Sequence, residues 1–133
     1  MSRYCLDTSA YSFFHRGDPA VVKLLDSADW IGISPVVLGE LWIGFLKGRH
    51  RERNLNQLQE FLAYSVVEEL TVDQKISRIY AEITLDLKAA GTPLPTNDIW
   101  IAASAVGSGA SVLSYDEHFR KIQRVGSIIL SVQ

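Results

Sequence analysis

This sequence of 133 residues has little of what marks the specialised classes of protein. It contains one cysteine, Cys5, so neither an internal disulfide nor a multi-cysteine zinc site can form. Four prolines and nine glycines are too few for a collagenous or low-complexity chain, and 47% hydrophobic residues are too many for a disordered one. We therefore expect a single globular domain over residues 1–133.

Long apolar runs are also missing. No run approaches the roughly 18 residues that a membrane-spanning helix needs, and the N-terminus shows no pattern of charged, apolar and small residues typical of a signal sequence. We therefore expect a cytoplasmic protein that does not associate with a membrane.

The chain has no strong excess of charge of either sign. A net charge of −2 and a pI near 5.9 give no general attraction to nucleic acid, so any such binding must be local or metal-assisted. The one dense basic stretch, Lys47–Arg53, offers a local patch of this kind. A solvated loop followed by a helix start would show the same composition, and both interpretations stay open.

What the sequence does contain is an alternation of short apolar runs with longer segments of helical periodicity. The runs predict strands over residues 4–7, 31–34, 65–70, 111–114 and 127–132. The other segments predict helices that begin near residues 8, 19, 35, 51, 73, 97 and 116. This pattern predicts an α/β protein: a three-layer α/β/α sandwich around a five-stranded, mostly parallel sheet.

Four acidic residues stand where this pattern changes from strand to helix or close to that point. Asp7 and Asp116 directly follow apolar strands, Asp98 opens a helix of mostly small and apolar residues, and Glu40 lies inside the helix after the second strand. Ligands of open parallel sheets gather at the carboxyl ends of the strands, where the strand order reverses. We therefore expect these four side chains to lie together.

The four positions also allow a simpler interpretation. Taken singly, Asp7, Asp98 and Asp116 each stand where a helix N-cap is expected, and Glu40 could be a partly exposed helix residue. Together they form a crowded set, because two like charges about 4 Å apart repel by roughly 4 kcal/mol at an effective dielectric near 20. An all-oxygen cluster of this kind suits Mg²⁺ or Mn²⁺.

The motifs around the four acidic residues, in this order and at these separations, resemble the PIN-domain ribonucleases, specifically the VapC-type toxins of toxin–antitoxin pairs. They read Leu6-Asp7-Thr8-Ser9, Glu40-Leu41, Asn97-Asp98-Ile99-Trp100-Ile101-Ala102-Ala103 and Leu113-Ser114-Tyr115-Asp116-Glu117-His118-Phe119. The resemblance implies that the four acidic residues bind the metal and are catalytic. It further implies a homodimer, an antitoxin protein as partner, and Mg²⁺- or Mn²⁺-dependent hydrolysis of RNA phosphodiester bonds.

Polar neighbours of the acidic residues are candidates for hydrogen bonds that orient the carboxylates, and each could equally cap a helix. They are Thr8, Ser9, Asn97 and Ser114. Glu117 is expected to be a solvated residue at a helix start. His118 is expected to be structural or to face the substrate, and Trp100 to belong to the core.

Two other classes of function compete with a nuclease toxin: a binding module, and phosphoryl-transfer signalling or phosphatase chemistry. A catalytically weak module of the same fold could bind RNA or a partner through the basic stretch, although the complete acidic set argues against it. A phosphatase with an aspartyl nucleophile would need an acidic residue two positions after Asp7, where Ser9 stands. A receiver domain would need a lysine after a late strand, and Lys121 does not have that position.

Overall fold

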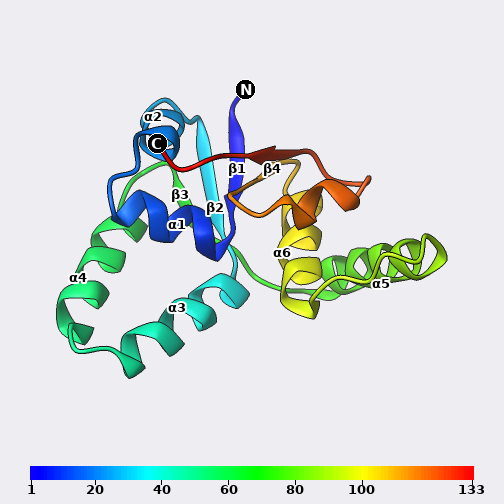
Figure 1. Cartoon of the computed structure of the whole chain (residues 1–133), viewed down its shortest axis with the longest axis horizontal. Coiled ribbons are helices and arrows are strands. Elements are labelled where there is room, and N and C mark those ends of the chain that lie inside the picture. The colour runs from blue at the N-terminus through cyan, green and yellow to red at the C-terminus, as the bar shows by residue number, and fades with distance from the viewer.

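Strands and helices alternate along the whole chain in the computed structural model, which describes residues 1–133 (Figure 1). The elements are β1 (Arg3–Leu6), α1 (Thr8–His15), α2 (Pro19–Asp26), β2 (Trp30–Ile33), α3 (Pro35–Lys47), α4 (Arg51–Leu62), β3 (Val67–Glu69), α5 (Gln74–Ala89), α6 (Thr96–Gly107), β4 (Ser111–Ser114), the 3₁₀ helix η1 (Glu117–Lys121) and β5 (Ser127–Ile129). The strands form one sheet in the order β3-β2-β1-β4-β5, and every neighbouring pair is parallel. The predicted α/β class and five-stranded sheet are confirmed, and the sheet is parallel throughout.

The strand order determines where the helices lie. Right-handed crossovers place the helices on one face while the chain steps from β1 to β2 to β3, and on the other face once it steps back to β4. Figure 1 shows this arrangement, with α1, α2 and α4 on one side of the sheet and α5 and α6 on the other. The order therefore reverses between β1 and β4, whose carboxyl ends form the topological switch point of the sheet.

The core lies on both faces of the three central strands. Leu6, Ile33 and Leu113 are almost completely buried, as parallel strands covered by helices require. Cys5 is buried with them, and this burial raises the pKa of its thiol to about 12, which leaves the thiol unreactive near neutral pH. No helix of the protein has the length and apolarity to cross a membrane.

The edges of the sheet differ from the expected boundaries. β3 covers only Val67–Glu69 and β5 only Ser127–Ile129, both shorter than predicted, because an edge strand pairs with a single neighbour and its ladder ends early. The last predicted helix, from residue 116, is the short 3₁₀ helix η1. Beyond β5, the amide of Leu130 still donates to the carbonyl of Ser114 at 2.8 Å.

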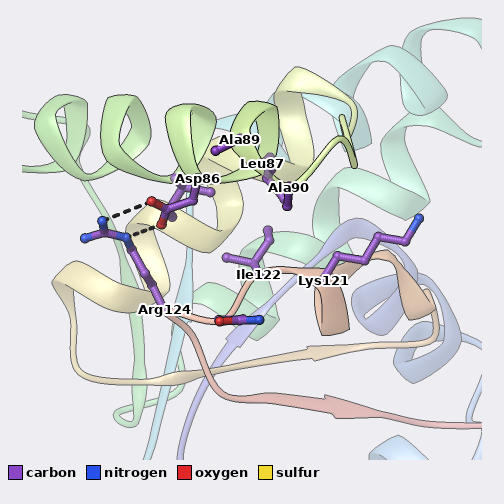
Figure 2. A pocket seen from close by; sticks show the side chains of 9 residues that line it. Asp86, Leu87, Ala89, Ala90, Lys121, Ile122 and Arg124 are labelled. Atoms are coloured by element: carbon purple, nitrogen blue, oxygen red, sulfur yellow. Dashed lines mark hydrogen bonds and ion pairs between the residues drawn. The ribbon is translucent and has the colours of Figure 1, made fainter.

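An open hollow of about 640 Å³ lies between the end of α5 and the segment after η1 (Figure 2). Ile83, Leu87 and Ile122 form part of its lining. An ion pair joins its two sides, with Arg124 Nε 2.5 Å from Asp86 Oδ2. None of the four predicted acidic residues lines it, so this hollow lies outside the predicted site.

We predict that Phe119→Ala destabilises the protein by about 3–5 kcal/mol, because it leaves a cavity where the ring of η1 is fully buried. Urea denaturation measures the change as a lower midpoint at unchanged slope. Leu85→Ala is the control, since Leu85 is 65% exposed, and it should change stability by less than about 0.5 kcal/mol. A loss of under 1 kcal/mol for Phe119→Ala would contradict the prediction.

Candidate functional site

Asp7 connects the carboxyl ends of the two central strands. It is the N-cap of α1, and its Oδ1 accepts hydrogen bonds from the amide of Ala10 at 2.8 Å and from Ser9 Oγ at 2.7 Å. Its Oδ2 accepts a hydrogen bond from Ser114 Oγ at 2.5 Å, across the junction between β1 and β4. The side chain is thus a helix cap and a bridge between strands at once, with only 6% of the residue exposed.

The same two serines fix the backbone that leads to Asp116. Ser9 Oγ accepts from the amide of Tyr115 at 3.0 Å, and Ser114 Oγ accepts from the amide of Asp116 at 2.8 Å. The position of the loop after β4 therefore depends on the hydroxyls that surround the Asp7 carboxylate.

Glu40 reaches the cluster from α3. Ser34 caps this helix through the amide of Val37, and Pro35 occupies its first turn, so Glu40 follows in the second turn. Its Oε1 accepts a hydrogen bond from Thr8 Oγ1 at 2.6 Å. Since Thr8 directly follows Asp7, this bond brings the half-buried Glu40 side chain to the end of β1.

Asp98 is not a helix cap, which was the simpler interpretation that the sequence also allowed. The helix α6 begins at Thr96, with Pro95 as the N-cap residue and no side-chain cap, so Asp98 is the third helical residue. The fixed φ of Pro95 starts the helix earlier than residue 97. A carboxylate in the first turn is favoured by the helix dipole, but that of Asp98 accepts no capping hydrogen bond and remains free for another partner.

His118 is that partner, and the sequence interpretation missed it. Its Nδ1 lies 3.4 Å from Asp98 Oδ2 and 3.2 Å from Asp116 Oδ2. One ligand atom from each of the three residues fits within 4.8 Å, a spacing that can hold a metal ion. Asp116 also caps η1 by accepting from the amide of His118 at 2.9 Å. The position of His118 two residues after the capping residue Asp116 is the only local sequence feature that could have indicated its role.

The remaining candidates lie apart from this cluster. Asn97 is exposed and makes no hydrogen bond to the carboxylates, unlike Thr8, Ser9 and Ser114. Glu117 is 3.5 Å from Arg120 and mostly exposed, as expected of a solvated helix start. Trp100 is half-buried and stacks on Tyr80, with ring centroids 3.9 Å apart.

The carboxylates of the cluster influence one another electrostatically. Burial raises the pKa of Asp7, opposed by hydrogen bonds from Ser114, the Ala10 amide and Ser9, while the charge of Asp98 raises it further. Burial also raises the pKa of Asp98. The hydrogen bond from His118 opposes this rise, and the charges of Asp116 and Glu40 add to it.

No lysine or arginine forms an ion pair with any of the four carboxylates. His118 is the only basic side chain in contact with them. A cluster of hard oxygen donors whose negative charge is not neutralised within the chain has the chemistry of a divalent-cation site.

A second buried carboxylate holds the loop after β4 from the other side. Asp18 stands at the N-cap position of α2, directly before Pro19, yet its side chain makes no cap hydrogen bond. It accepts instead from the hydroxyl of Tyr115 at 2.5 Å and from the amide of Gln133 at 2.8 Å. The rings of Tyr115 and Phe13 pack together with their centroids 4.3 Å apart. Burial is the main cause that raises the pKa of the Tyr115 phenol, and the hydrogen bond to Asp18 raises it further. Tyr115 thereby anchors the backbone between Ser114 and Asp116.

Comparisons with known proteins agree with this arrangement. Residues 4–125 match the family model of the PIN domain. The chain belongs to the PIN-domain family. It is 33% identical over 102 residues to Ribonuclease VapC4 of Mycobacterium tuberculosis, an alignment that covers 77% of this chain and 78% of VapC4.

Solved toxin–antitoxin complexes share the fold. The structure of VapBC2 from Rickettsia felis, bound to a DNA fragment from its promoter, contains a chain that matches with a TM-score of 0.83 and 26% identity, over 97% of this chain and 99% of that one. The DNA-bound VapBC of Salmonella typhimurium gives a TM-score of 0.81 and 28% identity, over 97% and 98% of the two chains. These PIN-domain relatives thus share the whole arrangement of elements, not a single motif.

We predict that Tyr115→Phe lowers the free energy of unfolding by about 1–3 kcal/mol, because the buried Asp18 carboxylate loses one of its two hydrogen-bond donors. Chemical denaturation measures the loss. Tyr64→Phe removes the same hydroxyl from a ring that is 56% exposed and should leave stability unchanged within about 0.5 kcal/mol. Equal effects of the two variants would show that the bond to Asp18 contributes nothing.

We also predict that Asp98→Asn stabilises the metal-free protein at pH 7. The pKa of Asp98 is higher in the folded chain than in the unfolded chain, so the folded wild type gains stability as the pH falls through that raised pKa. The advantage of the variant should therefore shrink between pH 7 and pH 4. Denaturation midpoints in chelator at the two pH values test this, and a variant that is less stable at pH 7 would contradict it.

Proposed function

We propose that this chain is a divalent-metal-dependent endoribonuclease that acts as the toxin of a toxin–antitoxin pair. The observation that supports it most strongly is the cluster of four carboxylates at the switch point of the sheet, which has no lysine or arginine partner. Its relatives are named ribonucleases, and an RNA-cleaving toxin acts in the cytoplasm, where its substrate lies.

The residues present fit Mg²⁺, with Mn²⁺ as a substitute, because the donors are predominantly carboxylate oxygens. We propose Asp7, Glu40, Asp98 and Asp116 as the metal-binding and catalytic residues. Asp98 and Asp116 would hold the ion most directly, with His118 beside them. A bound divalent ion supplies an activated water near neutral pH and offsets the charge that develops on the phosphate during hydrolysis.

The chain's own residues would orient this chemistry. Thr8 donates a hydrogen bond to Glu40, and Ser9 and Ser114 donate to Asp7, so these hydroxyls orient two of the four carboxylates. His118 faces both Asp98 and Asp116 from the exposed side of the cluster. Its imidazole is placed to contact a phosphate of the RNA that approaches the ion.

The proposed partners follow from the solved relatives, which are named as VapBC complexes. We propose that an antitoxin protein covers the carboxylate cluster of this chain, and that the chain forms a homodimer. α3 exposes Trp42, Ile43 and Leu46, an apolar stripe that a protein partner can cover.

Cleavage of total RNA by the pure protein with Mg²⁺ or Mn²⁺ tests the proposal. Asp98→Asn should lower the cleavage rate by at least about 100-fold, because it removes a proposed ligand, and chelator should abolish cleavage by the wild type. Asp26→Asn, an exposed substitution at the end of α2, is the matched control and should retain full activity.

Metal binding gives an independent measurement. At a metal concentration of 100 times Kd, the ion should stabilise the wild type by about 2.7 kcal/mol and Asp98→Asn by much less. RNA binding without cleavage in any metal would favour the alternative, a catalytically weak binding module. Equal cleavage with and without chelator would rule out the metal mechanism.

A further inference from the structure

The connection between α3 and α4 is the most basic part of this acidic protein. The α3–α4 tip, defined as residues Lys47–Arg53, contains one lysine, three arginines and a single glutamate. With His50 neutral, the tip has a charge of +3, so the rest of the chain has a charge of −5. All seven residues are exposed, and Figure 1 shows the tip at the far end of the α3–α4 pair, away from the sheet.

The cations of the tip have no acidic partner, unlike three of the other exposed arginines. Arg78, Arg120 and Arg124 each form an ion pair with a glutamate or an aspartate. No residue of the tip forms one. Like charges that no carboxylate of the chain neutralises repel one another, and an anionic ligand would relieve that repulsion.

The backbone holds these charges in place. The amide of Gly48 donates to the carbonyls of Gly44 and Phe45, which closes the end of α3. The Arg51 guanidinium donates to the carbonyl of Leu46 at 3.2 Å, and the amide of Asn54 donates to the carbonyl of His50 at 2.9 Å. The tip is therefore a short turn between two helices whose backbone, which carries the charged side chains, has a defined position relative to α3.

α3 connects the tip to the carboxylate cluster along one face. Lys47 follows Glu40 by seven residues, which places it on nearly the same side of the helix and about 10 Å along the axis. Gly44 lies between them on this face, and a Cβ there would contact nothing in the chain. Glycine destabilises a helix interior relative to alanine, so packing within this chain gives no reason for it. A ligand that approaches the helix backbone closely would explain the glycine at this position.

We propose that the α3–α4 tip binds the phosphate backbone of the RNA strand whose scissile bond lies at the carboxylate cluster. This inference rests on the proposed function, and it identifies where the substrate extends. About 10 Å corresponds to roughly three stacked nucleotides at about 3.4 Å each, so Lys47 meets the strand a few phosphates from the cluster. Arginine suits these contacts because its planar guanidinium donates two parallel hydrogen bonds to a phosphate.

An acidic segment of a partner protein is the competing occupant, and the structure favours RNA over it. Of the apolar side chains of α3 that a protein would cover, Trp42 and Leu46 lie on a different face from Glu40, Gly44 and Lys47. Ile43 borders that face next to Lys47. The strip of α3 that leads to the tip, Glu40, Gly44 and Lys47, is small and polar, and it begins at the cluster whose proposed substrate is a polyanion.

Fluorescence anisotropy with labelled single-stranded RNA of 4 and 12 nucleotides, in chelator so that no cleavage occurs, tests the inference. The variant is Arg49→Gln/Arg53→Gln, in which neither side chain makes a hydrogen bond or ion pair within the chain. The matched control is Arg78→Gln/Arg120→Gln, which removes the same charge from two exposed arginines that pair with glutamates.

The tip variant should bind the 12-mer at least about tenfold more weakly, while the control stays within about twofold of the wild type. Its plot of log affinity against log salt should be shallower by about 1.4, since each lost phosphate contact on a single strand contributes about 0.7. The 4-mer spans only about 10 Å, so it extends from the cluster no further than Lys47 and should bind the tip variant and the control alike.

Equal weakening by the tip variant and the control would overturn the inference, because it would show a general effect of net charge. Unchanged RNA binding by the tip variant, with or without weaker binding of an antitoxin, would also overturn it. The proposed function fails separately. RNA binding that depends on the tip, without cleavage in Mg²⁺ or Mn²⁺, would refute the nuclease while showing that the tip binds RNA.

Discussion

The carboxylate of Asp7 is buried at the end of β1, and a buried carboxylate is tolerated only when its oxygens are hydrogen-bonded. Here the partners come from three places: the amide of Ala10 in α1, Ser9 in the same turn, and Ser114 at the end of β4. Because β1 and β4 are neighbours on either side of the reversal in strand order, this one group fixes the junction at which the site is built. The backbone of Tyr115 and Asp116 is positioned by the same two serines.

The four carboxylates differ in how many hydrogen bonds they accept from the rest of the chain. Both oxygens of Asp7 are engaged by donors within the chain, and Glu40 accepts from Thr8, whereas Asp98 meets only His118. The most constrained carboxylates therefore organise the site, and the least constrained ones remain available to a ligand. This division explains why Asp98 and Asp116, with His118, form the group whose atoms are close enough together to hold an ion.

The α/β fold and the sheet edge that holds the acidic residues could be predicted from sequence, because both follow from local patterns. Short apolar runs and their spacing indicate strands, and Ser111–Ser114 was predicted to the residue. The misplaced features depend on contacts that no local pattern encodes. Asp98 and Asp18 resemble caps in sequence, but Pro95 starts α6 earlier, and Asp18 bonds to Tyr115, which is 97 residues away. His118 meets Asp98 across 20 residues, through the geometry of η1.

One helix, α3, carries both an acidic residue of the cluster and the start of the basic tip. α3 begins at the end of β2, presents Glu40 to the cluster in its second turn, and ends at the basic tip. A nuclease of net charge −2 repels its polyanionic substrate at long range, so local positive charge must offset that repulsion near the cleavage site. Placing the cations directly among the carboxylates would neutralise the negative charge that attracts a divalent ion. Separation along a rigid helix avoids this conflict, because the proposed phosphate contacts lie at the tip while the cluster, about two helical turns away, keeps the negative charge that a divalent-cation site requires.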